Sequence, residues 1–225
     1  GYMMTTTTRP KKTYKGPAME GFIADWYAKS TRGGGRHVAS AETLAASLRP
    51  GGRVLEVAPG PGYLAIELAQ RGDLRVCGLD ISASFVRIAT ENARAAGVQA
   101  EFRQGNASDM PYEDGSFDFV VCQAAFKNFA DPLGALDEVY RVLAPGGRAS
   151  IQDLRKNASL DDIDAEVASM NLGALSALWT KLTFRTFLLK NAYTDEAMME
   201  LVARSRFGRG DLRHDGIGFD RRLAR

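Results

Sequence analysis

The sequence is poor in the residues that build metal centres and disulfide frameworks. Its 225 residues include two cysteines, Cys77 and Cys122, and two histidines, His37 and His214. A structural zinc site needs about four nitrogen, sulfur or oxygen ligands, and these residues form no cluster along the chain. We therefore expect no metal. Both cysteines fall in strand-like apolar runs, where an unpaired cysteine is normally buried.

The sequence also lacks an excess of charge of either sign and any long apolar segment. There are 29 Lys and Arg residues against 27 Asp and Glu residues, a formal net charge of +2. That balance provides no global field to attract nucleic acid or an anionic membrane. No apolar run is long enough to span a bilayer, and no secretory segment opens the chain. We expect a cytoplasmic protein with no nucleic-acid partner and no membrane span.

The remaining composition is that of one globular domain. Apolar residues make up 45% of the chain and charged residues 25%, which is ordinary for a soluble fold, and the length favours a single domain over residues 1–225. Its expected parts are a mobile tail (1–15), N-terminal helices (17–48), a core (50–155), a helical cap insert (156–193), and a C-terminal helix with a strand hairpin (194–225).

Strands alternate with helices through most of the chain, which predicts an α/β fold with a mostly parallel sheet wound on both faces. Two short final strands, near residues 208–213 and 216–223, are separated by a turn at His214-Asp215. So short a connection permits only antiparallel pairing. Earlier strands are expected from residue 53 and over 74–79, 99–103, 117–122 and 148–154, so the sheet should have seven strands.

The most informative stretch is residues 53–66, where an apolar strand beginning Val54-Leu55 runs into a glycine turn and then a helix. Gly60 and Gly62 let the backbone approach a ligand closely, because neither carries a Cβ. A helix N-terminus at the carboxyl end of a parallel strand is where open α/β sheets bind nucleotide-like ligands.

Polar residues fall at the ends of three successive expected strands. Glu56 ends the first beside the glycine turn, Asp80 ends the second, and Asn106-Ala107 follow the third. A carboxylate at the second strand end can accept hydrogen bonds from two ribose hydroxyls, and one beside the turn can pair with an ammonium. Alternatively, Glu56 is a solvated loop residue and Asp80 caps the next helix.

The glycine turn also fits a dinucleotide site. Residues 60–65 match the pattern G-x-G-x-x-A, and Asp80 lies 18 positions after Gly62, near the ~20 typical of that motif. An NAD-dependent oxidoreductase is therefore an alternative. Against it, Glu56 would place negative charge near a pyrophosphate, and a terminal hairpin fits poorly with two repeated mononucleotide halves.

Several motifs in series resemble those of class I S-adenosylmethionine-dependent methyltransferases, most closely the ubiquinone/menaquinone-biosynthesis type. The motifs are residues 54–62, 78–82, 105–111, 115–121, 126–131 and 141–147. The resemblance covers about residues 50–155 and implies a Rossmann-like methyltransferase fold. One position departs from the family pattern, since Ala58 replaces the first glycine of the turn. Alanine is tolerated there if its φ is negative.

The resemblance implies a role for each matching position. Glu56 lies near the methionine ammonium of S-adenosylmethionine, Asp80 holds the ribose hydroxyls, and Ile81 packs on adenine. The other implied cofactor contacts are Ala58, Gly60 and Gly62 beneath the methionine and ribose, Asn106 and Ala107 at the adenine edge, and Gln123 near the methionine portion, with Tyr14 or Tyr27 closing over the cofactor.

The resemblance further implies transfer of the methyl group by in-line displacement to a small-molecule acceptor, with S-adenosylhomocysteine as product. Alignment supplies much of such a rate, and a general base is needed only for an acceptor that stays protonated. His37 and His214 are expected at the surface, so no base is evident. A cofactor-binding module without catalysis is therefore a further alternative.

The acceptor is expected to meet the N-terminal helix, the segment after the fourth strand and the insert. The candidates are Met19, Tyr27, Phe126, Lys127 and Asn128. Lys127 and Asn128 either bind an oxygen of the acceptor or form a solvated loop pair. A few apolar side chains of residues 170–189 are expected to point into the cleft, with ordinary core packing as the alternative for the rest.

Overall fold

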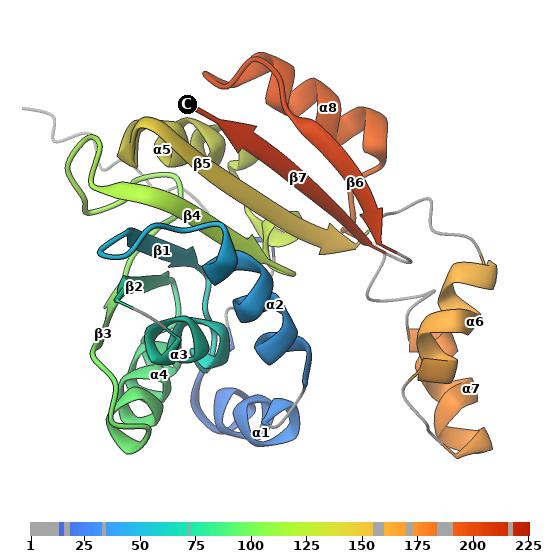
Figure 1. Ribbon diagram of the computed structural model, residues 1–225. Coiled ribbons are helices and arrows are strands. Elements are labelled where there is room, and N and C mark those ends of the chain that lie inside the picture. The colour runs from blue at the N-terminus through green and yellow to red at the C-terminus, as the bar shows by residue number, and fades with distance from the viewer. Residues whose placement is uncertain are drawn as a thin grey trace, which may run out of the picture.

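A seven-stranded sheet forms the centre of the protein (Figure 1). The computed structural model describes residues 14–15, 19–32, 35–71, 73–154, 160–169, 173–183, 191–215 and 218–225. The strand order is β3-β2-β1-β4-β5-β7-β6. Only β7 runs against the others, between β5 and β6. The strands are β1 (Arg53–Val57), β2 (Arg75–Asp80), β3 (Ala100–Gln104), β4 (Phe117–Gln123), β5 (Leu143–Leu154), β6 (Asp211–Asp215) and β7 (Gly218–Ala224). The predicted fold class, a doubly wound and mostly parallel sheet with an antiparallel C-terminal strand, is confirmed.

Helices cover both faces of the sheet. Side chains alternate along β1, so that Leu55 and Val57 join the core on one face of the sheet, whereas Val54 joins the core on the other face. This period of two is the reason one strand serves two cores. The helices are α1 (Gly21–Thr31), α2 (Gly35–Ala46), α3 (Tyr63–Gln70), α4 (Ala83–Ala95), α5 (Pro132–Val142), α6 (Leu160–Ser169), α7 (Ala174–Thr183) and α8 (Asp195–Arg204), with a short 3-10 helix η1 (Phe126–Asn128).

Helix caps explain where several of these helices begin. Asp131 accepts a hydrogen bond from Gly134 N ahead of the proline at the first position of α5, and Thr194 caps α8 in the same way through Ala197 N. Ser82 caps α4 through Phe85 N at 3.1 Å. These caps satisfy backbone N–H groups that the first helical turn leaves unpaired.

Some boundaries differ from the sequence-based expectation. The glycines at positions 33–35 predict a loop, with the second helix expected from about Ser40, whereas Gly35 begins α2. His214 and Asp215 are not a turn, because both pair with β7. The first strand of the hairpin therefore extends two residues further than predicted, and residues 216–217, before β7, lie outside the described part of the chain.

The last two residues of the expected N-terminal tail contact the body of the protein. Tyr14 forms an antiparallel bridge with Phe129, and Lys15 N donates to Asn128 O at 2.7 Å. These contacts argue against mobility for the two residues, residues 1–13 lie outside the described chain, and the mobile tail stays a prediction.

The expected helical insert corresponds to α6 and α7, which pack on each other. Figure 1 shows the pair set apart from the sheet, beyond the edge at which β4 and β5 end. Ile163 and Val167 of α6 are buried, whereas Leu175, Leu178 and Trp179 of α7 are exposed. Within the described residues, none of the helices combines the length and apolar character needed to cross a membrane.

Candidate cofactor and acceptor site

The centre of the sheet contains a topological switch point. From β1 the chain order runs outward through β2 and β3 on one side, and through β4 and β5 on the other. In open α/β sheets the carboxyl ends of strands at such a point border the ligand crevice. Glu56, Asp80 and Gln123 all lie at the carboxyl ends of strands, so the structure brings these predicted residues to one edge.

The turn after β1 has a left-handed backbone conformation at three positions, including the one that is not glycine. The φ angles of Ala58, Gly60 and Gly62 are 58°, 54° and 84°. A Cβ on Gly62 would meet Ala89 Cβ at 2.9 Å, so this glycine is required by packing as well as by conformation. The condition of a negative φ at Ala58 is not met. The alanine therefore holds a left-handed conformation that L-residues rarely adopt.

Glu56 is a buried carboxyl, not the solvated loop residue of the alternative interpretation. Its side chain accepts a hydrogen bond from the backbone of Ala65, whereas Oε2 has no partner among the described residues. Burial, reinforced by the nearby Asp80 charge, raises the pKa of Glu56 to about 8. A buried acceptor without a partner is costly, which makes Glu56 a natural contact for a cationic ligand group.

Asp80 fastens the glycine turn to the end of β2. Its Oδ2 accepts a hydrogen bond from Gly60 N at 3.0 Å, and its Oδ1 accepts one from Ser82 N at 2.9 Å. Burial raises the pKa of Asp80. Ser82, not Asp80, provides the side-chain cap of α4. The backbone of Ile81 also donates to this side chain, and because a carboxylate has about four lone-pair sites, Asp80 retains acceptor capacity beyond these three bonds.

The segment after β3 forms a closed turn. Asn106 Oδ1 accepts hydrogen bonds from Ser108 N at 3.0 Å and Ser108 Oγ at 2.9 Å, and Asp109 N donates to Asn106 O. Ala107 is half-buried against the core. Gln104 Nε2 donates to the carbonyl of Ile81 at 3.2 Å, so the expected adenine-facing segments are joined.

Gln123 begins a line of polar side chains across the sheet. Its Nε2 donates to Gln152 Oε1 at 2.7 Å, and Gln152 in turn donates to Ser150 Oγ at 3.1 Å. Beyond the end of β4, Ala124 has a φ of 56°. The strand ends on either side of the switch point are thus each followed by a left-handed alanine.

The segment after β4 is anchored by a buried ion pair. Lys127 Nζ lies 3.1 Å from Asp153 Oδ1, with side-chain exposures of 10% and 0%, and also donates to Ala124 O at 2.7 Å. Lys127 N donates to Asp153 Oδ2 at 2.8 Å. Lys127 is therefore not a solvated loop residue. Sequence reasoning missed Asp153, although the rule that selected Glu56 and Asp80, an acidic residue at the carboxyl end of a strand, also applies to it.

Tyr14 lies over this segment. Its phenol hydrogen-bonds the side chain of Asn128, and burial raises its pKa, with further contributions from the charges of Asp80 and Asp153. Those contributions place Tyr14 near the ends of both β2 and β5. Phe126 is buried, and its ring packs against those of Phe129 and Tyr193.

The two candidates near α1 have contacts with α4. Tyr27 packs edge-on against Phe85, with 5.8 Å between ring centroids, and is half-buried beside Ala24 and Ala28; that it closes over the cofactor stays a prediction. The Met19 carbonyl accepts a hydrogen bond from Ser82 Oγ at 2.6 Å. Glu20 accepts hydrogen bonds from Ala83 N and Ser84 N, so the start of α1 is fixed to the start of α4. Nothing in the local sequence indicates that link.

Because Ala58 is left-handed, replacing it with glycine is expected to raise the free energy of unfolding by about 1 kcal/mol. The left-handed region costs alanine roughly 1–2 kcal/mol, partly offset by the greater unfolded-state entropy of glycine. Urea unfolding measures the change, and Ala124→Gly should act in the same direction. The control is Ala39→Gly in α2, which should lower stability by about 0.5–1 kcal/mol. A loss of stability in Ala58→Gly would contradict the inference that the positive φ strains Ala58.

Known proteins share this core. Residues 55–151 match the family model of the methyltransferase domain. A demethylmenaquinone methyltransferase from Deinococcus radiodurans is 42% identical over 127 residues, which cover 56% of this chain and 52% of that protein. The chain thus spans about half the length of that relative. The resemblance inferred from the sequence motifs is confirmed.

Solved structures extend the likeness to nearly the whole chain. A SAM-dependent methyltransferase from Aquifex aeolicus superposes with a TM-score of 0.68 at 18% identity, covering 88% of this chain and 97% of that one. At that identity the likeness shows the fold. A 4+2 cyclase, 28% identical with a TM-score of 0.51, covers 53% of this chain and 46% of that one.

Proposed function

We propose, from the premise that residues 55–151 form a methyltransferase domain, that this protein transfers a methyl group from S-adenosylmethionine to a small-molecule acceptor. The observation that carries the proposal is the pair of buried carboxyls, Glu56 and Asp80, on either side of a glycine turn at the switch point of the sheet. The names of the sequence relatives and of the solved structures with this fold support an enzyme of this class.

The residues present fit S-adenosylmethionine. Glu56 has a buried oxygen without a partner among the described residues, which an ammonium would satisfy. Asp80 has acceptor capacity left for ribose hydroxyls, and the Gly60 position has open space where a side chain would otherwise stand. When bound, S-adenosylmethionine supplies a methyl group attached to a sulfonium. An acceptor atom would bond to the methyl carbon in line with the departing sulfur, which leaves as the thioether of S-adenosylhomocysteine.

The protein's contribution is then mainly alignment. Glu56 and Asp80 would hold the two ends of the ligand against the turn, and the rigid strand ends would fix the direction in which the methyl group points. Orientation of this kind can supply several kcal/mol, up to about 7–11 kcal/mol, of a reaction barrier. No general base is assigned to any residue.

We further propose an acceptor of the quinone class, a ring with oxygen substituents and an apolar body. The Deinococcus radiodurans relative is named for demethylmenaquinone. Asn128 and Tyr14 offer hydrogen bonds to a ring oxygen near the end of β4. Apolar side chains for the body of the acceptor project from α1, from the residue two positions before it, and from α7. They are Met19, Phe22, Ile23, Trp26, Leu175, Leu178, Trp179 and Leu182, all exposed.

The oxidoreductase alternative is weaker on structural grounds. Two mononucleotide-binding halves would require six parallel strands in one doubly wound sheet, whereas here β7 inserts antiparallel between β5 and β6. The raised pKa of Glu56 weakens one sequence-based argument, since a neutral carboxyl repels a pyrophosphate less. The cyclase neighbour supports retaining a second candidate, a protein that uses this fold without methyl transfer.

Mass spectrometry of an acceptor panel tests the activity. The panel contains reduced demethylated naphthoquinones and simple phenols and amines, each incubated with the full chain and S-adenosylmethionine. A gain of one methyl group on a naphthoquinol supports the proposal in full. Binding of S-adenosylhomocysteine without any methylated product would favour the non-methylating candidate.

Replacing Asp80 with alanine is expected to weaken S-adenosylhomocysteine binding by about 1–3 kcal/mol, the scale of hydrogen bonds to a charged group. Titration calorimetry measures the affinity. Asp80→Asn keeps acceptor capacity and should lose less. The matched control is Asp118→Ala, since that carboxylate pairs with Arg53 at the opposite end of β1 and β4. Unchanged affinity in Asp80→Ala would place the ribose elsewhere.

A further inference from the structure

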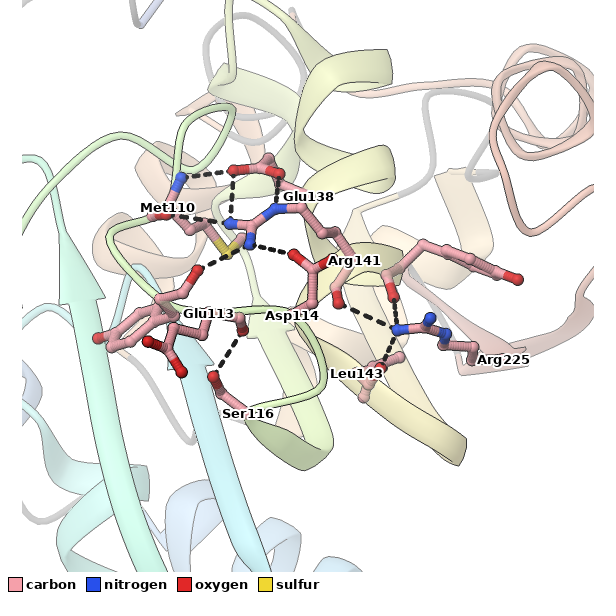
Figure 2. A network of polar contacts seen from close by, with 10 residues as sticks. Met110, Glu113, Asp114, Ser116, Glu138, Arg141, Leu143 and Arg225 are labelled. Carbon is pink, nitrogen blue, oxygen red and sulfur yellow. Dashed lines mark hydrogen bonds and ion pairs between the residues drawn. The ribbon is translucent and has the colours of Figure 1, made fainter.

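The loop over residues 105–116, which joins β3 to β4, is held from outside by two side chains of α5. Glu138 and Arg141 lie one turn apart and pair in bidentate fashion, with Arg141 Nε 2.5 Å from Glu138 Oε2 and Nη2 3.0 Å from Glu138 Oε1. Figure 2 shows this pair facing the loop. The planar guanidinium suits such a two-pronged contact, which a lysine cannot make.

The pair grips the backbone of Met110 at both of its polar groups. Met110 N donates to Glu138 Oε1 at 2.8 Å, and Arg141 Nη2 donates to Met110 O at 3.1 Å. Arg141 Nη1 also donates to Tyr112 O at 2.7 Å and to Asp114 Oδ1 at 2.9 Å. The Met110 side chain is buried in the core between the sheet and α5.

These contacts hold a loop whose first residue is bonded to the candidate site, since Gly105 N donates to the Asp80 carbonyl at 2.9 Å. Residues 106–109 are closed into a turn by the Asn106 side chain and by the Asp109-to-Asn106 backbone bond, and Met110 follows directly. The turn is therefore rigid within itself. Its position relative to the edge of the sheet depends on where the Glu138–Arg141 pair holds residue 110.

We propose that Arg141, held by Glu138, is a positioning residue that sets the turn at Asn106–Asp109 at the correct distance to read the adenine ring. This inference rests on the proposed function. The Asn106 side-chain oxygen is already used twice within the turn, so the turn backbone, including Ala107, is the part that would meet the base. Backbone groups that hydrogen-bond the edge of a base distinguish one base from another only if their position is fixed.

Adenine and hypoxanthine test this positioning directly. Adenine offers an amino donor and a ring acceptor along its edge, whereas hypoxanthine offers a carbonyl acceptor and a ring donor. A correctly placed backbone turn therefore favours S-adenosylhomocysteine over S-inosylhomocysteine. A displaced turn loses that preference while the ribose and amino-acid contacts, common to both ligands, remain.

Arg141→Lys is the test variant and Arg225→Lys its matched control. Arg225 Nη1 also donates to backbone carbonyls at the end of α5, those of Tyr140, Arg141 and Leu143, and Figure 2 draws no bond from its side chain to the loop. Titration calorimetry gives the dissociation constants of both nucleosides for each protein. We expect the ratio of the two constants to fall about tenfold in Arg141→Lys and to be unchanged in Arg225→Lys.

The outcomes separate the inference from the proposed function. If Arg141→Lys weakens the binding of both nucleosides equally, or only lowers the melting temperature, the Glu138–Arg141 pair has a structural role alone and the inference is overturned. If the wild-type protein binds neither nucleoside, the proposed function itself fails. Should Arg141→Lys not fold, Glu138→Gln replaces it, because glutamine keeps an acceptor for Met110 N while weakening the hold on Arg141. The same fall in the ratio is expected, to a smaller extent.

Discussion

Binding of S-adenosylhomocysteine at pH 7 is expected to release about 0.9 proton from the wild-type protein and none from the Glu56→Gln variant. With its pKa raised to about 8 by burial, Glu56 is mostly neutral at pH 7 before binding. An ammonium beside it favours the carboxylate and lowers the pKa, so the proton leaves as the ligand enters. Calorimetry in two buffers of different ionisation enthalpy counts the protons.

The variant should also bind more weakly, because glutamine cannot provide the opposite charge. We expect a loss of about tenfold to a hundredfold in affinity, in line with 1.5–3 kcal/mol for hydrogen bonds to charged groups. Asp118→Asn, at the far end of the sheet, should change neither the proton count nor the affinity. Equal proton release by Glu56→Gln and wild type would mean that another group titrates on binding.

The same residue makes the stability of the ligand-free protein depend on pH. A carboxyl whose folded pKa is raised from 4.5 to about 8 binds its proton more tightly in the folded state. The unfolded state therefore holds fewer protons between these values, and the free energy of unfolding falls as pH rises through that window. Glu56→Gln should remove this slope and be more stable at pH 7, by up to about 3 kcal/mol at 1.36 kcal/mol per unit.

Replacing Asp153 with asparagine is expected to lower the free energy of unfolding by about 3–5 kcal/mol. The substitution leaves the Lys127 ammonium buried without its counter-charge, and an uncompensated buried charge is far more costly than the intact pair is favourable. The two backbone links, Lys127 N to Asp153 and Lys127 Nζ to Ala124 O, mean that η1 should loosen as well. Urea unfolding at pH 7 measures the effect.

Two further variants show whether the charge is the cause. Lys127→Met combined with Asp153→Leu should recover most of the loss, because apolar replacement of a whole buried pair is often neutral. The exposed pair Arg53–Asp118, with side-chain exposures of 40% and 44%, serves as the control, and Asp118→Asn should cost about 1 kcal/mol at most. A double variant as unstable as Asp153→Asn would show that packing, not charge, dominates.

The candidate cofactor residues could be predicted because they follow from a short-range rule. Carboxyl ends of neighbouring parallel strands meet at one edge, so Glu56 and Asp80 could be placed together from strand assignment alone. The hydrogen bonds of these two carboxyls could not be predicted. Their donors are Gly60 N, Ser82 N and the Ala65 backbone, which reach the carboxyls only when the turn and α3 fold back onto β2. The φ of Ala58 was likewise inaccessible, because the residue type argues for the opposite sign.

The acceptor side was less predictable. Lys127 could be assigned either to the solvent or to the acceptor, and its burial against Asp153 depends on β5 lying beside β4. Tyr14 belonged to a segment expected to be mobile, and its place over η1 comes from a bridge to Phe129, far along the chain. Tyr27 was a candidate cover, and its contact with Phe85, at 5.8 Å between ring centroids, depends on α1 lying against α4.

By itself the sequence determined the alternation of strands and helices, the doubly wound class and the sheet edge where polar residues gather. It could do so because apolar periodicity, glycine turns and helix caps act over a few residues. Only the tertiary structure decided that Glu56 prefers to be neutral, that Lys127 is paired with Asp153 and that Arg141 holds Met110. Each of these depends on burial and on side chains brought together from elements distant in sequence, which no local pattern encodes.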